Sequence, residues 1–128
     1  MPKESSSCLF CSIPPERIIA ENDLAFAIRD GFPVTDGHTL VIPKRHAEDY
    51  FELTADELLA CDRLNRQIRE EIREADPGVQ GFNIGMNVGA AAGQTIFHCH
   101  IHLIPRRAGD VENPRGGVRH LIPGKGDY

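Results

Sequence analysis

The chain has 128 residues, of which 41% are hydrophobic and 26% charged, and its formal net charge is −5. This length predicts a single domain over residues 1–128. No apolar run approaches the roughly 20 residues that a membrane helix needs, so we expect no membrane partner. An acidic chain is not expected to bind nucleic acid through general attraction to its backbone. The polar N-terminus lacks the apolar centre of a signal peptide, so we expect a cytoplasmic protein.

Three short apolar runs near the start of the chain predict β-strands. Residues 17–21 and 24–30 are separated by the turn-forming pair Asn22 and Asp23, and a third run, residues 38–43, ends at a proline. These strands precede a segment in which the spacing of apolar residues changes.

From Thr54 to about Asp76, apolar residues recur in steps of three and four, which predicts one long helix with a single buried face. Thr54 followed by Glu57 is the pattern of a capping box at the first turn. Asp76 is followed by Pro and Gly, which end helices. This stretch is therefore the principal helix of the predicted fold.

Two more apolar runs follow the helix, at residues 81–88 and 95–106, joined by a loop of small residues. The tail, residues 108–128, is rich in Gly and Pro, and its one strand-like stretch is residues 117–123. About five strands suited to antiparallel pairing, together with one long helix, predict an α+β domain.

The run HCHIHLI carries three histidines at every second position: His98, His100 and His102. On a strand, alternate residues share one face, so the three imidazoles would lie together while the intervening apolar residues enter the core. A solvated strand face usually carries Lys, Glu or Thr. Three aligned imidazoles therefore favour metal ligation, acid–base chemistry or nucleophilic chemistry.

Cys8 and Cys11 form a C-x-x-C pair near the N-terminus. The strand-to-helix context of a thioredoxin-like redox site does not follow the pair, and no later C-x-x-C or H-x₃₋₅-H completes a zinc finger. From the residues alone, the pair is either two free thiols or part of a metal site with ligands from distant segments. Cys61 and Cys99 fall at apolar positions of the predicted helix and strand, so we expect both in the core.

The segment AGQTIFHCHIHLIPR resembles the motif of the histidine triad (HIT) superfamily of nucleotide hydrolases and transferases. The segments CLFC and AFAIRDGFPVTDGHTLVIPKRH extend the resemblance over most of the chain up to about Asp110. It implies a HIT-like fold, an antiparallel sheet with one long helix, that forms homodimers.

The resemblance also implies hydrolysis of a nucleoside monophosphate, with AMP the leading candidate, from a phosphoramidate or a dinucleoside polyphosphate through a nucleotidyl-histidine intermediate. The alternatives are a non-catalytic, zinc-stabilised nucleotide-binding module and a nucleotidyltransferase or phosphorylase of the same superfamily. Those transferase and phosphorylase branches tend to carry glutamine at the third triad position. His102 is a histidine, which favours the hydrolase.

In this resemblance His100 is the nucleophile, His102 assists the leaving group, and His38 lies near the triad. Asp30 matches the position that binds the ribose hydroxyls. Asn87, Gln94 and Thr95 are expected to contact the phosphate, and Gly89 and Gly93 to let the backbone approach it. The expected contacts to the base are from Phe26, Ile28 and Phe32.

HIT proteins with an N-terminal cysteine pair bind zinc through both cysteines, the histidine after the sequence IPK and the first triad histidine. The matching residues are Cys8, Cys11, His46 and His98. A complete Cys₂His₂ set has no vacancy for a catalytic water, so the Zn²⁺ would be structural. It would tie the N-terminal segment, residues 1–15, to the third strand and the triad. The roles of three tail residues stay open: Arg115, Arg119 and His120.

Overall fold

The computed structural model describes residues 7–126 and residue 128, so residues 1–6 of the predicted N-terminal metal-binding segment lie outside the described part. Among the described residues, no helix is long and apolar enough to cross a membrane. Besides the long helix and the strands, the chain contains short 3-10 helices at Leu9–Cys11, Pro15–Arg17, Tyr50–Glu52, Ala90–Ala92 and Gly117–Leu121.

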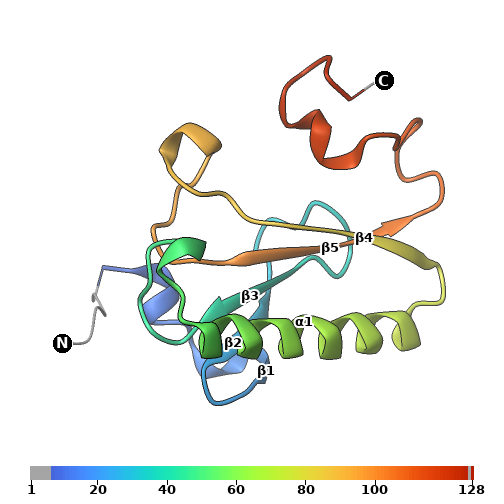
Figure 1. Ribbon diagram of the computed structural model, residues 1–128. Coiled ribbons are helices and arrows are strands. Elements are labelled where there is room, and N and C mark those ends of the chain that lie inside the picture. Colours follow the sequence, from blue (N-terminus) through green and yellow to red (C-terminus); the bar gives the residue numbers. More distant parts are fainter. Residues whose placement is uncertain (1–6, 127) are drawn as a thin grey trace.

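Five antiparallel strands form one sheet in the order β1-β2-β3-β5-β4 (Figure 1). The strands are β1 (Ile18–Glu21), β2 (Ala25–Arg29), β3 (Thr39–Pro43), β4 (Val79–Gly85) and β5 (Ile101–Arg107). In β5, which lies between β3 and β4, His102 pairs with Leu40 on one side and with Gly85 on the other. The third triad histidine is therefore held inside the sheet rather than at its edge.

The helix α1 (Ala55–Ala75) begins and ends as the sequence predicts. The Thr54 side chain accepts from the Glu57 backbone and the Glu57 side chain accepts from the Thr54 backbone, which confirms the capping box. The apolar face of α1 packs on one face of the sheet (Figure 1). The core between them contains Ala25, Ala27, Val41, Cys61, Leu64, Ile68, Ile72, Ile101 and Leu103.

Cys61 and Cys99 are both in the core, with exposed fractions of 1% and 2%, as the sequence predicts. Burial raises the pKa of the Cys61 thiol to about 11 and that of the Cys99 thiol to about 12. Both side chains are therefore protonated at neutral pH and behave as small apolar residues.

The opposite face of the sheet has a second apolar cluster of Phe10, Phe26, Ile28, Leu40 and Ile42. The N-terminal 3-10 helix Leu9–Cys11 covers part of this face, because Phe10 is buried in the cluster. The tail lies on the side of the sheet away from α1 (Figure 1). The cavity that stays open on this face is lined by His100 and His102.

Three predicted strands differ from the structure: β4 runs Val79–Gly85 rather than over residues 81–88, and two others differ more. β5 begins at Ile101 rather than at Thr95, because the chain just before it leaves the ladder: Cys99 N donates to Ala47 O at 2.7 Å, and the side chain of His98 bonds Pro43 O. The strand-like stretch in the tail is a 3-10 helix, Gly117–Leu121. Gly116 and Gly117 have φ of 88° and 42°, which turns the chain out of an extended path.

Candidate active site and metal centre

A cavity of about 280 Å³ lies on the open sheet face, between the N-terminal 3-10 helix and the loop that precedes β5. It crosses the sheet from β5 through β3 and β2 toward the start of β1. Its lining contains Leu9, Phe10, Arg17, Ile28, Asp30, Gly31, Phe32, Leu40, Asn87, Thr95, Ile96, His100 and His102. The cavity is therefore apolar at its centre and presents two imidazoles at one end.

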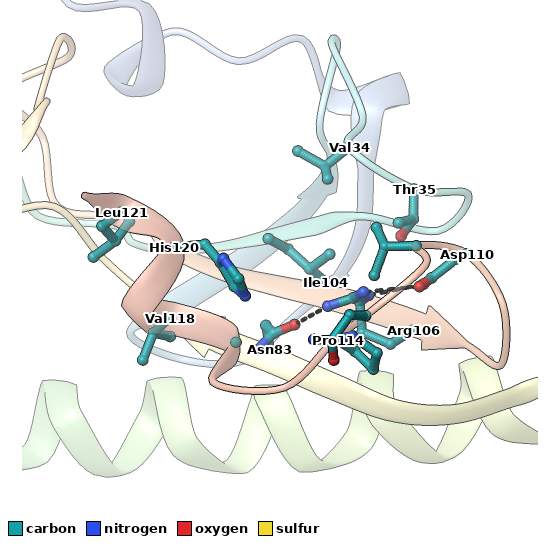
Figure 2. Close-up of a pocket in the computed structure, with 13 residues that line it drawn as sticks. Val34, Thr35, Asn83, Ile104, Arg106, Asp110, Pro114, Val118, His120 and Leu121 are labelled. Carbon is teal, nitrogen blue, oxygen red and sulfur yellow. Dashed lines mark hydrogen bonds and ion pairs between the residues drawn. The ribbon is translucent and has the colours of Figure 1, made fainter. Parts of the chain in front are cut away.

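A larger cavity, of about 520 Å³, lies between β4, β5 and the tail (Figure 2). Its charged groups are paired with one another: Arg106 bonds both carboxylate oxygens of Asp110 at 2.8 Å and donates to Asn83 at 2.7 Å. Figure 2 shows these bonds as dashed lines from Arg106 to Asn83 and to Asp110. This cavity presents apolar side chains and neutralised charges, so we place the chemistry in the smaller cavity.

His100 is oriented by the backbone of its own segment. Its Nδ1 lies 2.8 Å from the carbonyl oxygen of His98. A carbonyl can only accept, so Nδ1 carries the proton and Nε2 of the neutral ring has a free lone pair. The ring packs edge-on against Phe10, with centroids 5.0 Å apart. His100 thus has the tautomer that a nitrogen nucleophile needs.

His38 and His102 form a hydrogen-bonded pair whose tautomers can be assigned in order. Val34 N donates to His38 Nδ1 at 3.0 Å, so Nε2 of His38 carries the proton of the neutral ring. Nε2 in turn donates to His102 Nδ1 at 2.9 Å. The neutral His102 therefore has its proton on Nε2, ready to donate to a ligand. Asp30 Oδ2 lies 3.5 Å from His38 Nε2 and supports this order electrostatically.

Burial decides the charge of this pair in the free protein. Desolvation, reinforced by His100 and His38, lowers the pKa of His102 to about 4, although Asp30 acts in the opposite direction. Desolvation also lowers the pKa of His38, against the same opposing effect of Asp30. Both rings are therefore neutral near pH 7.

The four predicted metal ligands converge at the other end of the triad segment. The ligand atoms of Cys8, Cys11, His46 and His98 all lie within 4.8 Å of one another. Cys11 Sγ is 3.1 Å from His46 Nδ1, and Cys8 Sγ is 3.4 Å from His98 Nδ1. In a tetrahedral zinc site with the usual bond lengths, sulfur and nitrogen ligands are about 3.5 Å apart. The distances within the cluster fit such a site.

The protonation of His98 also fits metal ligation. Its Nε2 donates to Pro43 O at 2.8 Å, which leaves Nδ1 unprotonated and facing the two thiols. His98 is completely buried, and desolvation lowers its pKa. A second group, Asp30, His38 and His102, also lies within 4.8 Å, but the His38–His102 hydrogen bond explains its closeness.

The structure brings most of the predicted nucleotide contacts to the small cavity. Ile28, Asp30, Asn87 and Thr95 line it, and so does Phe32, whose side chain is 94% exposed. Phe26 is on the same sheet face but is only 6% exposed and outside the lining, because it packs in the apolar cluster with Phe10. The prediction that Phe26 contacts the base is therefore corrected: it supports the cavity from below.

Gln94 also has a different role from the predicted one. Its side chain is 5% exposed, donates from Nε2 to Glu48 O at 2.7 Å and to Ile96 O at 3.1 Å, and accepts from Gly89 N at 2.8 Å. The amide is fully used in holding the loop, so it is not the phosphate donor. Gly93 ends the 3-10 helix Ala90–Ala92 at φ 93°, a conformation that favours glycine, and lies outside the lining.

Six residues of the lining were missed from the sequence: Leu9, Phe10, Arg17, Gly31, Leu40 and Ile96. Leu9 and Phe10 could have been found, because a metal ligated by both Cys8 and Cys11 must place the two residues between them beside the triad. Arg17 is the one Arg or Lys in the lining, and its Nη2 donates to Arg29 O at 3.1 Å. No sequence pattern marked Arg17.

Comparisons with known proteins agree with this geometry. The family model of the HIT domain matches residues 13–109. An uncharacterised HIT-like protein of Mycoplasma genitalium is 45% identical over 107 residues, 80% of this chain and 74% of that protein. An adenylylsulfatase of Arabidopsis thaliana is 38% identical over 109 residues, 82% of this chain and 55% of that protein.

A zinc-bound histidine triad family protein from Mycobacterium smegmatis has a similar solved structure, with a TM-score of 0.74 and 40% identity over 81% of this chain and 78% of that chain. The five-stranded antiparallel sheet with one long helix confirms the predicted α+β, HIT-like fold. The chain belongs to the HIT domain family.

Proposed function

We propose that the protein is a nucleotidyl hydrolase. Its reaction is the cleavage of a nucleoside monophosphate, AMP in the first instance, from a phosphoramidate or a dinucleoside polyphosphate. The observation that carries this proposal is the hydrogen bond from His100 Nδ1 to His98 O, which leaves a free Nε2 lone pair in a residue that lines the cavity. Membership of the HIT family and the similarity to an adenylylsulfatase support it.

The cavity suggests how the nucleotide lies. Its α-phosphate fits at the end formed by His100 and His102, where Asn87 and Thr95 are available as donors. Asp30 lies in the lining over β2, and its Oδ2 is an acceptor for a ribose hydroxyl because Oδ1 already accepts from Phe32 N at 2.7 Å. The base then lies among apolar side chains at the β1 end of the cavity, which are Leu9, Ile28 and Phe32.

In the first step, the Nε2 lone pair of His100 attacks the α-phosphorus while the bond from phosphorus to the leaving group breaks. The leaving group needs a proton, which His102 Nε2 supplies. In the free protein His102 is neutral, but the negative phosphate of a bound nucleotide raises the pKa of the adjacent imidazole. The acid therefore forms in the complex with substrate: the His38 Nε2 proton passes to His102 Nδ1, and His38 takes up a proton from solvent at Nδ1.

In the second step, a water molecule attacks phosphorus and the bond to His100 breaks, returning the electron pair to Nε2. The neutral His102 takes the proton of that water at Nε2, and the His38–His102 pair releases one proton to solvent as the products leave, which restores the neutral pair of the free protein. In the free protein His38 holds His102 in one tautomer through the Nε2–Nδ1 hydrogen bond, and it touches neither reacting atom. His100 keeps its Nδ1 proton throughout, because His98 O holds it.

We further propose that Cys8, Cys11, His46 and His98 hold Zn²⁺. The four-ligand cluster and the zinc-bound relative support this site. A bound ion would supply a structural cross-link between the N-terminal 3-10 helix, the end of β3 and the triad segment. Metal analysis of purified protein by mass spectrometry should find about one equivalent of zinc, and less than half an equivalent would contradict the site.

We also propose a homodimer, as expected from the family resemblance. Within the described residues β4 is an edge strand, and Ile84 on it is 54% exposed, which is typical of a surface that another chain covers. Light scattering after gel filtration would give twice the mass of the chain. The cytoplasmic location and the absence of a nucleic-acid partner stay predictions from the sequence.

The decisive test of function is His100→Ala with an adenosine 5′-phosphoramidate. We expect turnover to fall by at least about a thousandfold, as when a covalent nucleophile is lost, while AMP binding measured by calorimetry changes little. Trapped wild-type protein should carry a nucleotidyl group on His100. A wild-type protein that binds AMP but cleaves no nucleotidyl conjugate would instead be a nucleotide-binding module.

A further inference from the structure

The two residues between the metal-ligating cysteines belong to the nucleotide cavity. Phe10 is 5% exposed and packs edge-on against His100 at 5.0 Å and against His98 at 6.1 Å, measured between ring centroids. Leu9 is 57% exposed and lines the cavity together with Ile28. The 3-10 helix Leu9–Cys11 thus has its thiols on the metal cluster and its apolar side chains on the substrate site.

The segment is attached to the body in two ways, by the burial of Phe10 in the apolar cluster of the sheet and by the thiols at the metal cluster. Its backbone hydrogen bonds Cys11 N to Cys8 O and Ser12 N to Leu9 O close its own turn, at 3.2 and 3.3 Å. The thiols of Cys8 and Cys11 reach toward His98 and His46 from opposite ends of that turn. Thiols are weak hydrogen-bond partners, whereas thiolates bound to a metal are held at fixed positions.

We propose that occupancy of the Cys8–Cys11–His46–His98 cluster regulates nucleotide binding, because the metal-bound cysteines hold Leu9 and Phe10 in place as one wall of the nucleotide cavity. This inference rests on the proposed nucleotide site and gives that site a regulator. The cluster and the cavity are two distinct sites joined by the turn Leu9–Cys11 and by the segment from His98 to His100. The proposal therefore assigns the metal a role in substrate affinity as well as in the fold.

The size and symmetry of the effect follow from linkage. Without the metal, the turn exchanges with conformations in which the wall is displaced, and the apparent nucleotide affinity falls with the fraction of protein that has the wall in place. Coupling between two sites of this kind is typically several-fold to about a hundredfold, and we expect about tenfold. Reciprocity requires that a bound nucleotide raises the affinity for zinc by the same factor.

The experiment measures AMP binding by titration calorimetry to the full chain, first loaded with Zn²⁺ and then stripped by a chelator and dialysed. Far-UV circular dichroism confirms that the stripped protein is folded. We expect the AMP dissociation constant to rise about tenfold on stripping and to recover when Zn²⁺ is returned. The zinc dissociation constant, measured by competition with a chromogenic chelator, should rise about tenfold when AMP is omitted.

A second variant tests the wall without removing the metal, in case the stripped protein does not fold. Leu9→Ala should keep the full zinc content and bind AMP about fivefold more weakly. The loss is moderate because a half-exposed aliphatic side chain contributes only part of the contact energy of a fully buried one. The matched control is Leu59→Ala on α1, whose side chain is 47% exposed and outside the cavity lining. We expect the control to bind AMP as the wild type does.

The outcomes separate the inference from the proposed function. Equal AMP affinity of the loaded and stripped proteins, or wild-type affinity of Leu9→Ala, would overturn the regulation while the nucleotide site stands. An AMP affinity that depends on zinc without a matching effect of AMP on zinc would also overturn it, because linkage is reciprocal. A zinc-loaded protein that binds no nucleotide would overturn the nucleotide site itself.

Discussion

The two faces of the sheet are made from alternate residues of the same strands, yet they use those residues differently. Under α1, Ala27, Val41 and Leu103 are fully or almost fully buried and belong to one apolar core. On the other face, His100 and His102 take the corresponding places in the last strand and the residues leading into it, and each is held by a hydrogen bond. One face stabilises the fold through packing, while the other keeps imidazoles partly dehydrated in defined tautomers.

This difference has a physical cost on the second face. A buried imidazole is favourable only where its nitrogens have partners, and burial works against its charged form. The cost is limited because Val34 N, His38 and His102 form one continuous chain of hydrogen bonds. The site face therefore depends on polar partners from segments distant in the chain, whereas the helix face depends on the local spacing of apolar residues.

Replacing His102 by Ala should give the largest effect and should fall on activity rather than on stability. Loss of a general acid and base typically reduces kcat by about 10²- to 10⁴-fold. Steady-state kinetics should show the full loss for a phosphoramidate, whose amine leaves with a proton, and a smaller loss for a nitrophenyl ester of AMP. The control is His120→Ala in the exposed tail. Equal losses for the two leaving groups would contradict the role of His102 as the acid.

Replacing Ile68 by Ala tests the helix face, where the effect should fall on stability rather than on activity. Ile68 is completely buried between α1 and the sheet, so the truncation leaves a cavity and lowers the free energy of unfolding by about 2–5 kcal/mol. Urea unfolding of the zinc-loaded protein measures it. Leu59→Ala, on the exposed side of the same helix, should stay within about 0.5 kcal/mol of wild type. A large fall in kcat of folded Ile68→Ala would show that the two faces are not independent.

Replacing Thr54 by Ala should weaken the helix face by a smaller amount. The Thr54 hydroxyl accepts from Glu57 N at 3.1 Å in the capping box, and losing such a cap costs about 1 kcal/mol. Thr54→Ser keeps the hydroxyl and should restore most of the stability in the same urea experiment. If serine and alanine destabilise equally, the hydroxyl is not the stabilising group.

A further effect should appear in the pH dependence of stability, and it belongs to the site face. The pKa of His102 is about 4 in the folded protein, below the ordinary value of 6.5. Between these values the unfolded chain binds a proton that the folded protein does not, so stability falls as the pH is lowered from about 6.5 toward 4. Burial also lowers the pKa of His38, the hydrogen-bond partner of His102, so His38 contributes to the same fall in stability.

The measurement is the urea midpoint of wild-type and His102→Gln proteins at several pH values from 7 to 4.5. We expect a shallower decline for His102→Gln, because one depressed histidine has been removed. Ile68→Ala should show the wild-type slope from a lower starting point. Parallel wild-type and His102→Gln curves would contradict the depressed pKa of His102.

The elements that could be predicted from the sequence are those with a local signal. The helix α1 was found from its three- and four-residue spacing and from the Thr54–Glu57 cap, and β1, β2 and β3 were found within one or two residues. The start of β5 was wrong because an alternating pattern does not tell whether a strand partner is present. The tail helix was missed because two consecutive glycines can turn the chain in several ways.

The candidate site was predicted in its chemistry but less well in its contacts. The metal ligands and the triad came from the family resemblance, and the structure groups Cys8 with His98, which lie 90 residues apart in the chain. Gln94 and Phe26 were assigned to the ligand, yet one holds a loop through three hydrogen bonds and the other is buried below the cavity. Burial and side-chain hydrogen bonds decide such roles, and neither can be seen in the residue type.

The sequence by itself determined the α+β pattern, the apolar face of α1 and the placing of three imidazoles at alternate positions, because each depends on the spacing of neighbouring residues. Only the tertiary structure decided the tautomer of each imidazole. The carbonyl of His98 frees Nε2 of His100, and His38, which comes 64 residues earlier, sets the tautomer of His102. For His102 a hydrogen bond from a distant segment selects the tautomer, and only the folded chain brings the two segments together.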